Sequence, residues 1–367
     1  MMDAPYFLVP APDGSDRAHL ATLVAGAVHR LAPLGFAFGR VAAVSPDYVA
    51  GLLPVRATRA RVYRAQLGPG GTVTRRRTVG LPPHLTVHAF ALHGPFLYVG
   101  GAWSPRAEGT GLGAAAGRLD LRVTAPQWEP VDLPVPAAVG KALDDVLADA
   151  QGLVLVDNIV FPKYLFAYRW SVGEGLPMDP QAVELPFWRV YEHIQKGQLS
   201  AEYVALLSTS AGMDGVGTYV SVLRRSDWTP VVVFTYEQSR EEQWAEALLM
   251  HPWDAPVRSA CPFDVALQEH TLVLACPGAL LFIDLWAFPT LTQPPCRVRG
   301  DEAEFEPTYP LVDLRGDAPV PGVGWEILAP HERPDSIRFI APRQLLLTTM
   351  GNAELNAERA WVRNVNL

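Results

Sequence analysis

Cysteine is scarce in this sequence of 367 residues, and the spacing of its few cysteines excludes two classes of protein. Only Cys261, Cys276 and Cys296 occur, widely separated and without a C-x-x-C pair. Neither a zinc site of that spacing nor a disulfide framework is therefore expected. An odd number of isolated cysteines favours a reducing compartment, and we expect a cytoplasmic protein.

Long uninterrupted apolar runs are also missing. The stretch MMDAPYFLVPAPDGSD has no basic region followed by an apolar region of useful length, so we expect no signal peptide. The run AHLATLVAGAVHRLAPLGFAF is broken by His29, Arg30 and Pro33, which argues against a membrane span. We therefore expect no association with a membrane.

Charge is sparse and unevenly distributed. Charged residues make up 19% of the chain and the net charge is −8, yet residues 1–80 hold ten arginines against four aspartates, a local +6 that leaves −14 elsewhere. The overall sign argues against general nucleic-acid binding, and the asymmetry suggests an oriented interaction surface. Arg59, Arg61 and Arg64 alternate along one expected strand, and 75–77 form an arginine run on the next. Two interpretations fit this arginine pattern: a solvated basic surface, and a binding site for an acidic protein partner.

What the sequence does contain is apolar material in short, regularly spaced segments. Hydrophobic residues make up 49% of the chain, and its 30 glycines and 34 prolines are spread evenly, which is typical of many short elements joined by turns. An apolar strand, a tight turn and a second apolar strand recur, each pair followed by a third strand and usually a fourth. The recurring pairs are 39–54, 87–101, 145–158, 188–208, 264–276 and 337–349.

Six such units, each a four-stranded meander, predict an all-β chain that forms one β-propeller domain over 1–367, with its blades in 39–367. Seven blades are also compatible, because 301–325 is unassigned. The last unit ends after its third strand at Leu367. We expect 6–10 (YFLVP) to supply the missing fourth strand and close the ring, because closure removes exposed sheet edges.

Helical periodicity predicts two insertions into the propeller. In 15–31, apolar residues recur at i, i+3, i+4, i+7, i+8 and i+11 after a possible cap at Ser15. In 239–250, Ser239 can cap a helix whose first turn is acidic and which Pro252 follows. Both insertions fall between a fourth strand and the next first strand.

In a propeller, the connections from a fourth strand to the next first strand lie on the same face as the loops between second and third strands. The loops on this face supply the candidate binding residues. Asp157 and Asn158 interrupt a very apolar stretch where a second strand ends. Asp and Asn favour turns, so turn chemistry and a ligand-facing role both account for the pair. The full set of candidates is Trp103, Arg106, Asp157, Asn158, Lys163, Asp214, Trp244, Trp253 and Asn352.

Asp145, Asp264 and Asp335 lie at or just before first strands, which line a propeller channel. A ring of carboxylates there could bind Ca²⁺ or Mg²⁺. Alternatively, each carboxylate accepts backbone N–H bonds from the neighbouring blade. The run GTGLGAAAG (109–117) lacks the G-K-[ST] and the strand–helix context of a phosphate loop, and His84, His88 and His93 do not cluster with carboxylates at ligand spacing.

Phrases such as VLADAQGLVLVDN and HAFALHGPFLYVGG resemble the blade repeats of β-propellers at large. WD40, Kelch and sialidase motifs are absent, so the resemblance implies the fold and carries over no functional residues. The sequence favours a non-catalytic propeller that serves as a protein-interaction or scaffold subunit of a bacterial multi-protein system, with a protein partner and no cofactor. Two alternatives stay open: a metal-dependent hydrolase or lactonase that uses Ca²⁺ or Mg²⁺ at the channel mouth, and a small-molecule sensor.

Overall fold

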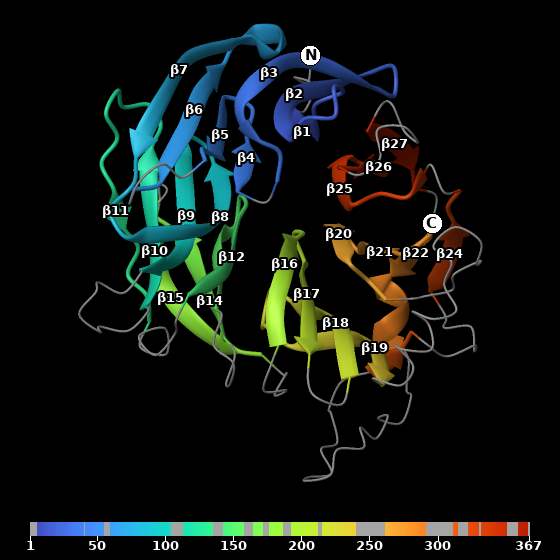
Figure 1. Ribbon diagram of the computed structural model, residues 1–367. Coiled ribbons are helices and arrows are strands. Elements are labelled where there is room, and N and C mark those ends of the chain that lie inside the picture. Colours follow the sequence, from blue (N-terminus) through green and yellow to red (C-terminus); the bar gives the residue numbers. More distant parts are fainter. Residues whose placement is uncertain are drawn as a thin grey trace. The chain divides into compact units, whose positions relative to one another are not determined.

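The protein is all-β, and its computed structural model shows the seven sheets of a seven-bladed β-propeller (Figure 1). The regular structure that is described consists of strands and the short 3-10 helices η1 (Pro69–Gly71) and η3 (Leu285–Thr290). No described helix has the length and apolarity needed to span a bilayer. The structure describes residues 6–39, 41–54, 59–103, 113–134, 142–157, 164–171, 176–185, 192–211, 215–239, 261–290, 311–314, 322–329, 332–350 and 359–365.

The chain divides into two compact units, which are described separately. Unit 1 comprises residues 1–188 and 348–363, and unit 2 comprises 189–347 and 364–367. The single domain expected from the sequence stays a prediction. The all-β propeller is confirmed, with the larger of the two blade numbers that the sequence allowed.

Unit 1 contains four sheets, and within each sheet neighbouring strands are antiparallel. Three hydrophobic clusters lie between successive sheets, so each sheet is buried by its neighbour in the chain. The sheets are β1 (Phe7–Pro10), β2 (Arg17–Val24) and β3 (Ala27–Ala37); β4 (Ala42–Val44), β5 (Tyr48–Leu52), β6 (Arg61–Leu67) and β7 (Val73–Gly80); β8 (Leu85–His93), β9 (Phe96–Trp103), β10 (Gly113–Asp120) and β11 (Glu129–Pro130); and β12 (Leu143–Ala148), β13 (Gly152–Asp157), β14 (Tyr164–Trp170) and β15 (Pro177–Glu184).

The helix expected over 15–31 is wrong, because this segment forms the hairpin β2–β3. Val24 pairs with Ala27 across a two-residue loop, and both loop residues, Ala25 and Gly26, have positive φ (51° and 81°). Such a loop matches the twist of a hairpin and ends any helical run. The apolar spacing of 15–31 fits a strand with a turn as well as a helix, and the pairing of β1 with β2 decides for the strand. This sheet is the blade that is missing from the six units expected from the sequence.

The closing role expected for 6–10 is also wrong. β1 pairs with β2 inside its own sheet and does not serve as a fourth strand for β25–β27. Instead, a side chain joins the two chain ends within unit 1. Arg359 is 1% exposed and its guanidinium donates hydrogen bonds to the carbonyls of Ala11 (2.9 Å), Ser15 (3.1 Å), Thr349 (3.3 Å) and Met350 (2.7 Å).

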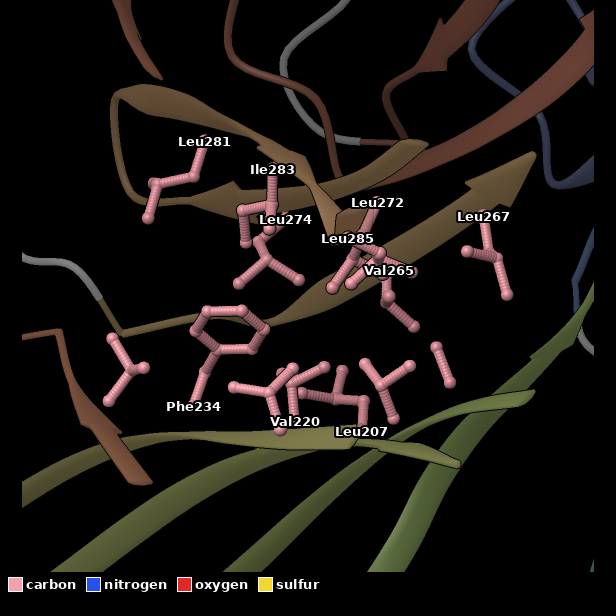
Figure 2. Packing of buried hydrophobic residues seen from close by; sticks show 14 of the residues in the cluster. Leu207, Val220, Phe234, Val265, Leu267, Leu272, Leu274, Leu281, Ile283 and Leu285 are labelled. Carbon is pink, nitrogen blue, oxygen red and sulfur yellow. The ribbon is translucent and has the colours of Figure 1, made fainter. Parts of the chain in front are cut away.

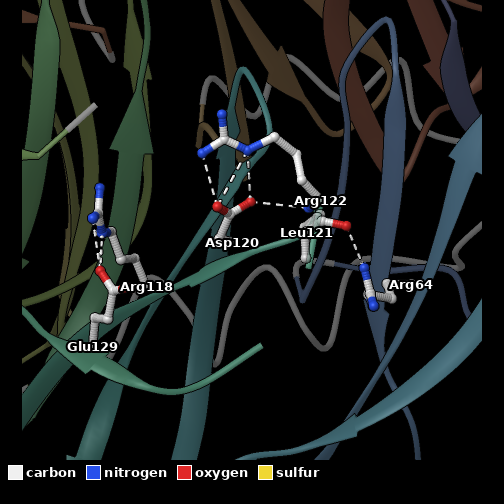
Figure 3. Close-up of polar contacts among 6 residues, drawn as sticks. All are labelled: Arg64, Arg118, Asp120, Leu121, Arg122 and Glu129. Atoms are coloured by element: carbon white, nitrogen blue, oxygen red, sulfur yellow. Dashed lines mark hydrogen bonds and ion pairs between the residues drawn. The ribbon is translucent and has the colours of Figure 1, made fainter. Parts of the chain in front are cut away.

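A second buried arginine, Arg64 on β6, links two sheets of unit 1. Its guanidinium donates to the carbonyls of Leu121, Val123 (2.7 Å) and Thr124 (2.9 Å), which follow β10 (Figure 3). Burial lowers the pKa of this guanidinium, and the bonds to carbonyls compensate part of the lost hydration. Of the alternating arginines in 59–64, Arg64 is therefore buried and structural, whereas Arg59 and Arg61 are exposed.

Unit 2 and the strands that complete the chain form three further sheets. The hydrophobic cluster of unit 2 packs the sheet of β16–β19 against that of β20–β22 (Figure 2). The rings of Phe234 and Phe288 lie edge to face, with their centroids 5.3 Å apart. The sheets are β16 (Glu192–Leu199), β17 (Tyr203–Ala211), β18 (Gly215–Arg224), β19 (Pro230–Ser239) and the parallel β23 (Leu311–Asp313); β20 (Asp264–Gln268), β21 (Thr271–Cys276), β22 (Ala279–Asp284) and β24 (Val323–Ile327); and β25 (Ser336–Ala341), β26 (Gln344–Thr348) and β27 (Ala360–Asn364). The helix expected over 239–250 lies outside the described residues beyond Ser239.

Replacing Arg359 with methionine should lower the free energy of unfolding by ~3 kcal/mol, because four carbonyls, two of them in buried hydrogen bonds, lose a charged donor while the apolar stem stays. Urea denaturation followed by tryptophan fluorescence measures the change. The matched control is Arg61→Met, at an exposed position, which should stay within about 0.5 kcal/mol of the parent. Equal effects of the two substitutions would contradict the structural role of Arg359.

Candidate active site

A bulge in the first strand of the third sheet positions one histidine. In the ladder between β8 and β9, Val87 pairs with Gly101 and Ala89 with Gly100, so His88 is the extra residue. The two glycines make this arrangement possible. A Cβ on Gly101 would lie 1.9 Å from the Thr86 carbonyl oxygen, and one on Gly100 would lie 2.3 Å from Cγ2 of Val146 on β12. Bulges of this kind re-aim a side chain, and they are frequent beside active sites.

The imidazole of His88 reaches from β8 to β12. Its Nδ1 lies 2.9 Å from the carbonyl oxygen of Leu143. A carbonyl oxygen can only accept, so Nδ1 carries the proton and donates it. Nε2 is then the ring nitrogen that can accept a proton or a ligand, and no partner for it occurs among the residues that the structure describes. The hydrogen bond fixes both the tautomer and the orientation of the ring.

A second bulge lies next to the Leu143 carbonyl. In the ladder between β12 and β13, Leu143 pairs with Asp157 and Asp145 with Val156, which leaves Asp144 as the extra residue. Asp144 therefore directly follows Leu143, whose carbonyl accepts the hydrogen bond from His88. Asp157 lies directly across the ladder from Leu143. Directly opposed residues of antiparallel strands have Cα atoms about 4.5–5.5 Å apart. We call His88, Asp144 and Asp157 the His88 site.

Asp157 is fully buried at the end of β13. In the ladder it pairs with Leu143. A carboxylate removed from water is costly unless other groups compensate it, so buried acids are concentrated at functional positions.

The predicted metal ligands are occupied by other contacts. In unit 2, Asp264 is buried, and its Oδ1 accepts from Lys196 Nζ (2.6 Å) and from the Val265 N–H (2.9 Å), while Oδ2 accepts from the Ile337 N–H (2.7 Å). Lys196 also donates to the Ile337 carbonyl (3.0 Å). The ammonium thus stands where a bound cation would, and the carboxylate satisfies the backbone of the neighbouring first strand.

The other two carboxylates of that set behave differently. Asp145 accepts the Val146 N–H in unit 1 (2.9 Å), and Asp335 in unit 2 is exposed. In the part of the chain that the structure describes, no three His, Cys, Asp or Glu side chains form a group that could hold a metal ion.

Of the nine predicted binding residues, two are described. Trp103 ends β9 and is 37% exposed, and Asp157 ends β13. Both thus lie where the second strand of a unit 1 sheet ends. The remaining seven lie outside the described residues: Arg106, Asn158, Lys163, Asp214, Trp244, Trp253 and Asn352.

His88, Asp144 and Lys196 were not predicted as site residues from the sequence. His88 and Lys196 act on groups that are 55 and 68 residues away in the chain, so local sequence does not indicate their partners. One local signal was present. Gly100 and Gly101 lie inside an apolar strand, and paired glycines in a strand indicate a bulge or a close backbone approach.

No family model and no curated protein matches the chain. Among solved structures, the Synechocystis apocarotenoid oxygenase is 11% identical over 77% of this chain and 69% of its own (TM-score 0.38). A putative 6-phosphogluconolactonase from Bacteroides fragilis is 11% identical over 77% and 91% (TM-score 0.36), and the dihydro-heme d1 dehydrogenase NirN is 13% identical over 78% and 72% (TM-score 0.40).

The expectation of a non-catalytic scaffold is corrected, because these three solved structures bear the names of enzymes. No substrate, cofactor or residue role is transferred from those proteins to this chain.

Replacing Lys196 with methionine should lower the free energy of unfolding by about 3 kcal/mol, because Asp264 would remain a buried carboxylate without its cation. Asp264→Asn keeps an acceptor for the Ile337 N–H and should cost less. Guanidinium denaturation measures both. The assignment of Lys196 and Asp264 as a structural ion pair is wrong if Lys196→Met leaves the free energy of unfolding unchanged. It is also wrong if added Ca²⁺ raises the melting temperature of the parent protein through binding to Asp264.

Proposed function

We propose that this chain is a hydrolase of small esters or lactones in which His88 is the general base. The observation that carries the proposal is the 2.9 Å bond from His88 Nδ1 to the Leu143 carbonyl, which leaves Nε2 as the basic nitrogen. A histidine with one ring nitrogen held by an acceptor is the form that general-base catalysis requires. Lactones are cyclic esters, so one mechanism covers both substrates.

In the proposed step, Nε2 removes a proton from a water molecule as the water oxygen attacks the carbonyl carbon of the substrate. The resulting tetrahedral intermediate collapses, the C–O bond to the leaving alcohol breaks, and the imidazolium returns its proton to that oxygen. One water is consumed, and one acid and one alcohol form.

The bond to Leu143 also limits the motion of the base. β12 lies close against β9 at Gly100, and β8 pairs with β9, so the imidazole is anchored between two strands rather than on a loop. Preorganisation of this kind reduces the entropy lost on reaching the transition state.

A reducing, cytoplasmic setting also belongs to this proposal. Neither Cys261 nor Cys276 is bound in a disulfide, and burial raises the pKa of Cys276 well above its ordinary value, so the Cys276 thiol stays protonated at neutral pH. A buried, protonated thiol of this kind fits a compartment in which disulfides do not persist.

The test is hydrolysis of p-nitrophenyl acetate, p-nitrophenyl butyrate, γ-butyrolactone and δ-valerolactone by the purified full chain. His88→Asn keeps an N–H at the position of Nδ1 but lacks a base, so kcat/KM should fall at least about 100-fold while the circular dichroism spectrum and the melting temperature are retained. The control is His84→Asn, at an exposed residue whose left-handed φ (65°) asparagine accepts. It should keep full activity.

Two results would overturn the proposal. One is a wild-type protein that hydrolyses none of the four substrates faster than buffer. The other is a His88→Asn variant that keeps wild-type kcat/KM, because the reaction would then use a different base.

A further inference from the structure

Four arginines of unit 1 are exposed on one pair of neighbouring strands. Arg61 begins β6, and Arg75, Arg76 and Arg77 are consecutive in β7. Among the described residues, none of the four forms an ion pair. We call these four residues the arginine cluster. β7 is the last strand in its sheet, so the cluster lies along a sheet edge.

The backbone of β7 is distorted where the cluster lies. Arg64 pairs with Arg77 and Gln66 with Thr74, so Arg75 and Arg76 together face the single residue Ala65. Arg75 occupies the left-handed region at φ 47°, where glycine would be favoured. A bulge interrupts the strict alternation of side chains between the two faces of a strand. The side chains of Arg75, Arg76 and Arg77 therefore do not simply alternate between the two faces of the sheet. One of the three, Arg75, has an uncommon backbone conformation.

Neighbouring arginines show how a structural role differs from that of the cluster. Arg64 is buried and donates to three carbonyls, Arg118 pairs with Glu129 (2.6 Å), and Arg122 pairs with Asp120 (2.8 Å) (Figure 3). Each of these guanidiniums has a protein acceptor. The cluster has no carboxylate of its own among the described residues, so its positive charge is available to a ligand from outside.

We propose that the arginine cluster binds a short acidic polypeptide segment laid along β7. Guanidinium groups bind carboxylates through two parallel hydrogen bonds. No further strand among the described residues pairs with β7, so its outer edge offers backbone groups to an extended chain. The eight residues of β7 span roughly 26 Å, which matches a short peptide. Residues 81–367 carry a net −14, which disfavours a long polyanion that would extend beyond the cluster. This inference does not depend on the proposed hydrolase activity.

The experiment measures binding of a fluorescein-labelled deca-glutamate peptide to the full chain by fluorescence anisotropy at low and physiological salt. The test variant combines Arg75→Asn, Arg76→Gln and Arg77→Gln, in which asparagine suits the left-handed position. We expect its Kd to rise about tenfold and the wild-type affinity to fall with added NaCl.

The matched control also removes three exposed positive charges, by Arg122→Gln, Arg169→Gln and Arg224→Gln, and should keep Kd within about twofold. A 12-base-pair DNA duplex and a deca-glutamine peptide serve as competitors and should compete poorly. The proposal fails if the wild-type protein does not bind the peptide, if the control loses as much affinity as the test variant, or if the DNA competes better than unlabelled deca-glutamate.

Discussion

The absence of side chains at Gly100 and Gly101 is the constraint on which the candidate site depends. Any Cβ at Gly101 would overlap the Thr86 carbonyl, and any Cβ at Gly100 would overlap Val146. Because neither residue has a side chain, β8 can accommodate an extra residue and β12 can lie against β9. The imidazole of His88 then meets the Leu143 carbonyl across two sheets. Two glycines that carry no chemistry thus determine where the chemistry can occur.

Much of the architecture could be predicted from the sequence, because each blade repeats a local pattern. The pairs β8–β9, β12–β13, β20–β21 and β25–β26 all fall within the apolar segments that flank a tight turn. The hairpin β2–β3 could not be recognised in the same way. Its apolar residues satisfy the helical and the strand periods equally, and only the pairing with β1 and the positive φ of Ala25 and Gly26 separate the two.

The site was less predictable, because its groups meet through tertiary structure. The Asp157 position was recognisable as a polar interruption in an apolar stretch, but its burial and its partner Leu143 follow from the register of β12 and β13. For Asp264, the sequence left a metal and a backbone bond open. Lys196 on the preceding sheet decides between them, and nothing near Asp264 in the sequence indicates that a lysine 68 residues earlier would reach it.

The bonds of Arg359 have a consequence for the order in which the chain folds. Unit 1 takes its first part from residues 1–188 and its last from 348–363, so most of unit 2 is an insertion within it. During synthesis the carbonyls of Ala11 and Ser15 emerge from the ribosome hundreds of residues before their donor. They must remain hydrated, or engage a temporary donor, until Arg359 has been made. Completion of unit 1 therefore follows the synthesis of most of unit 2, even though the first sheets of unit 1 are translated earlier.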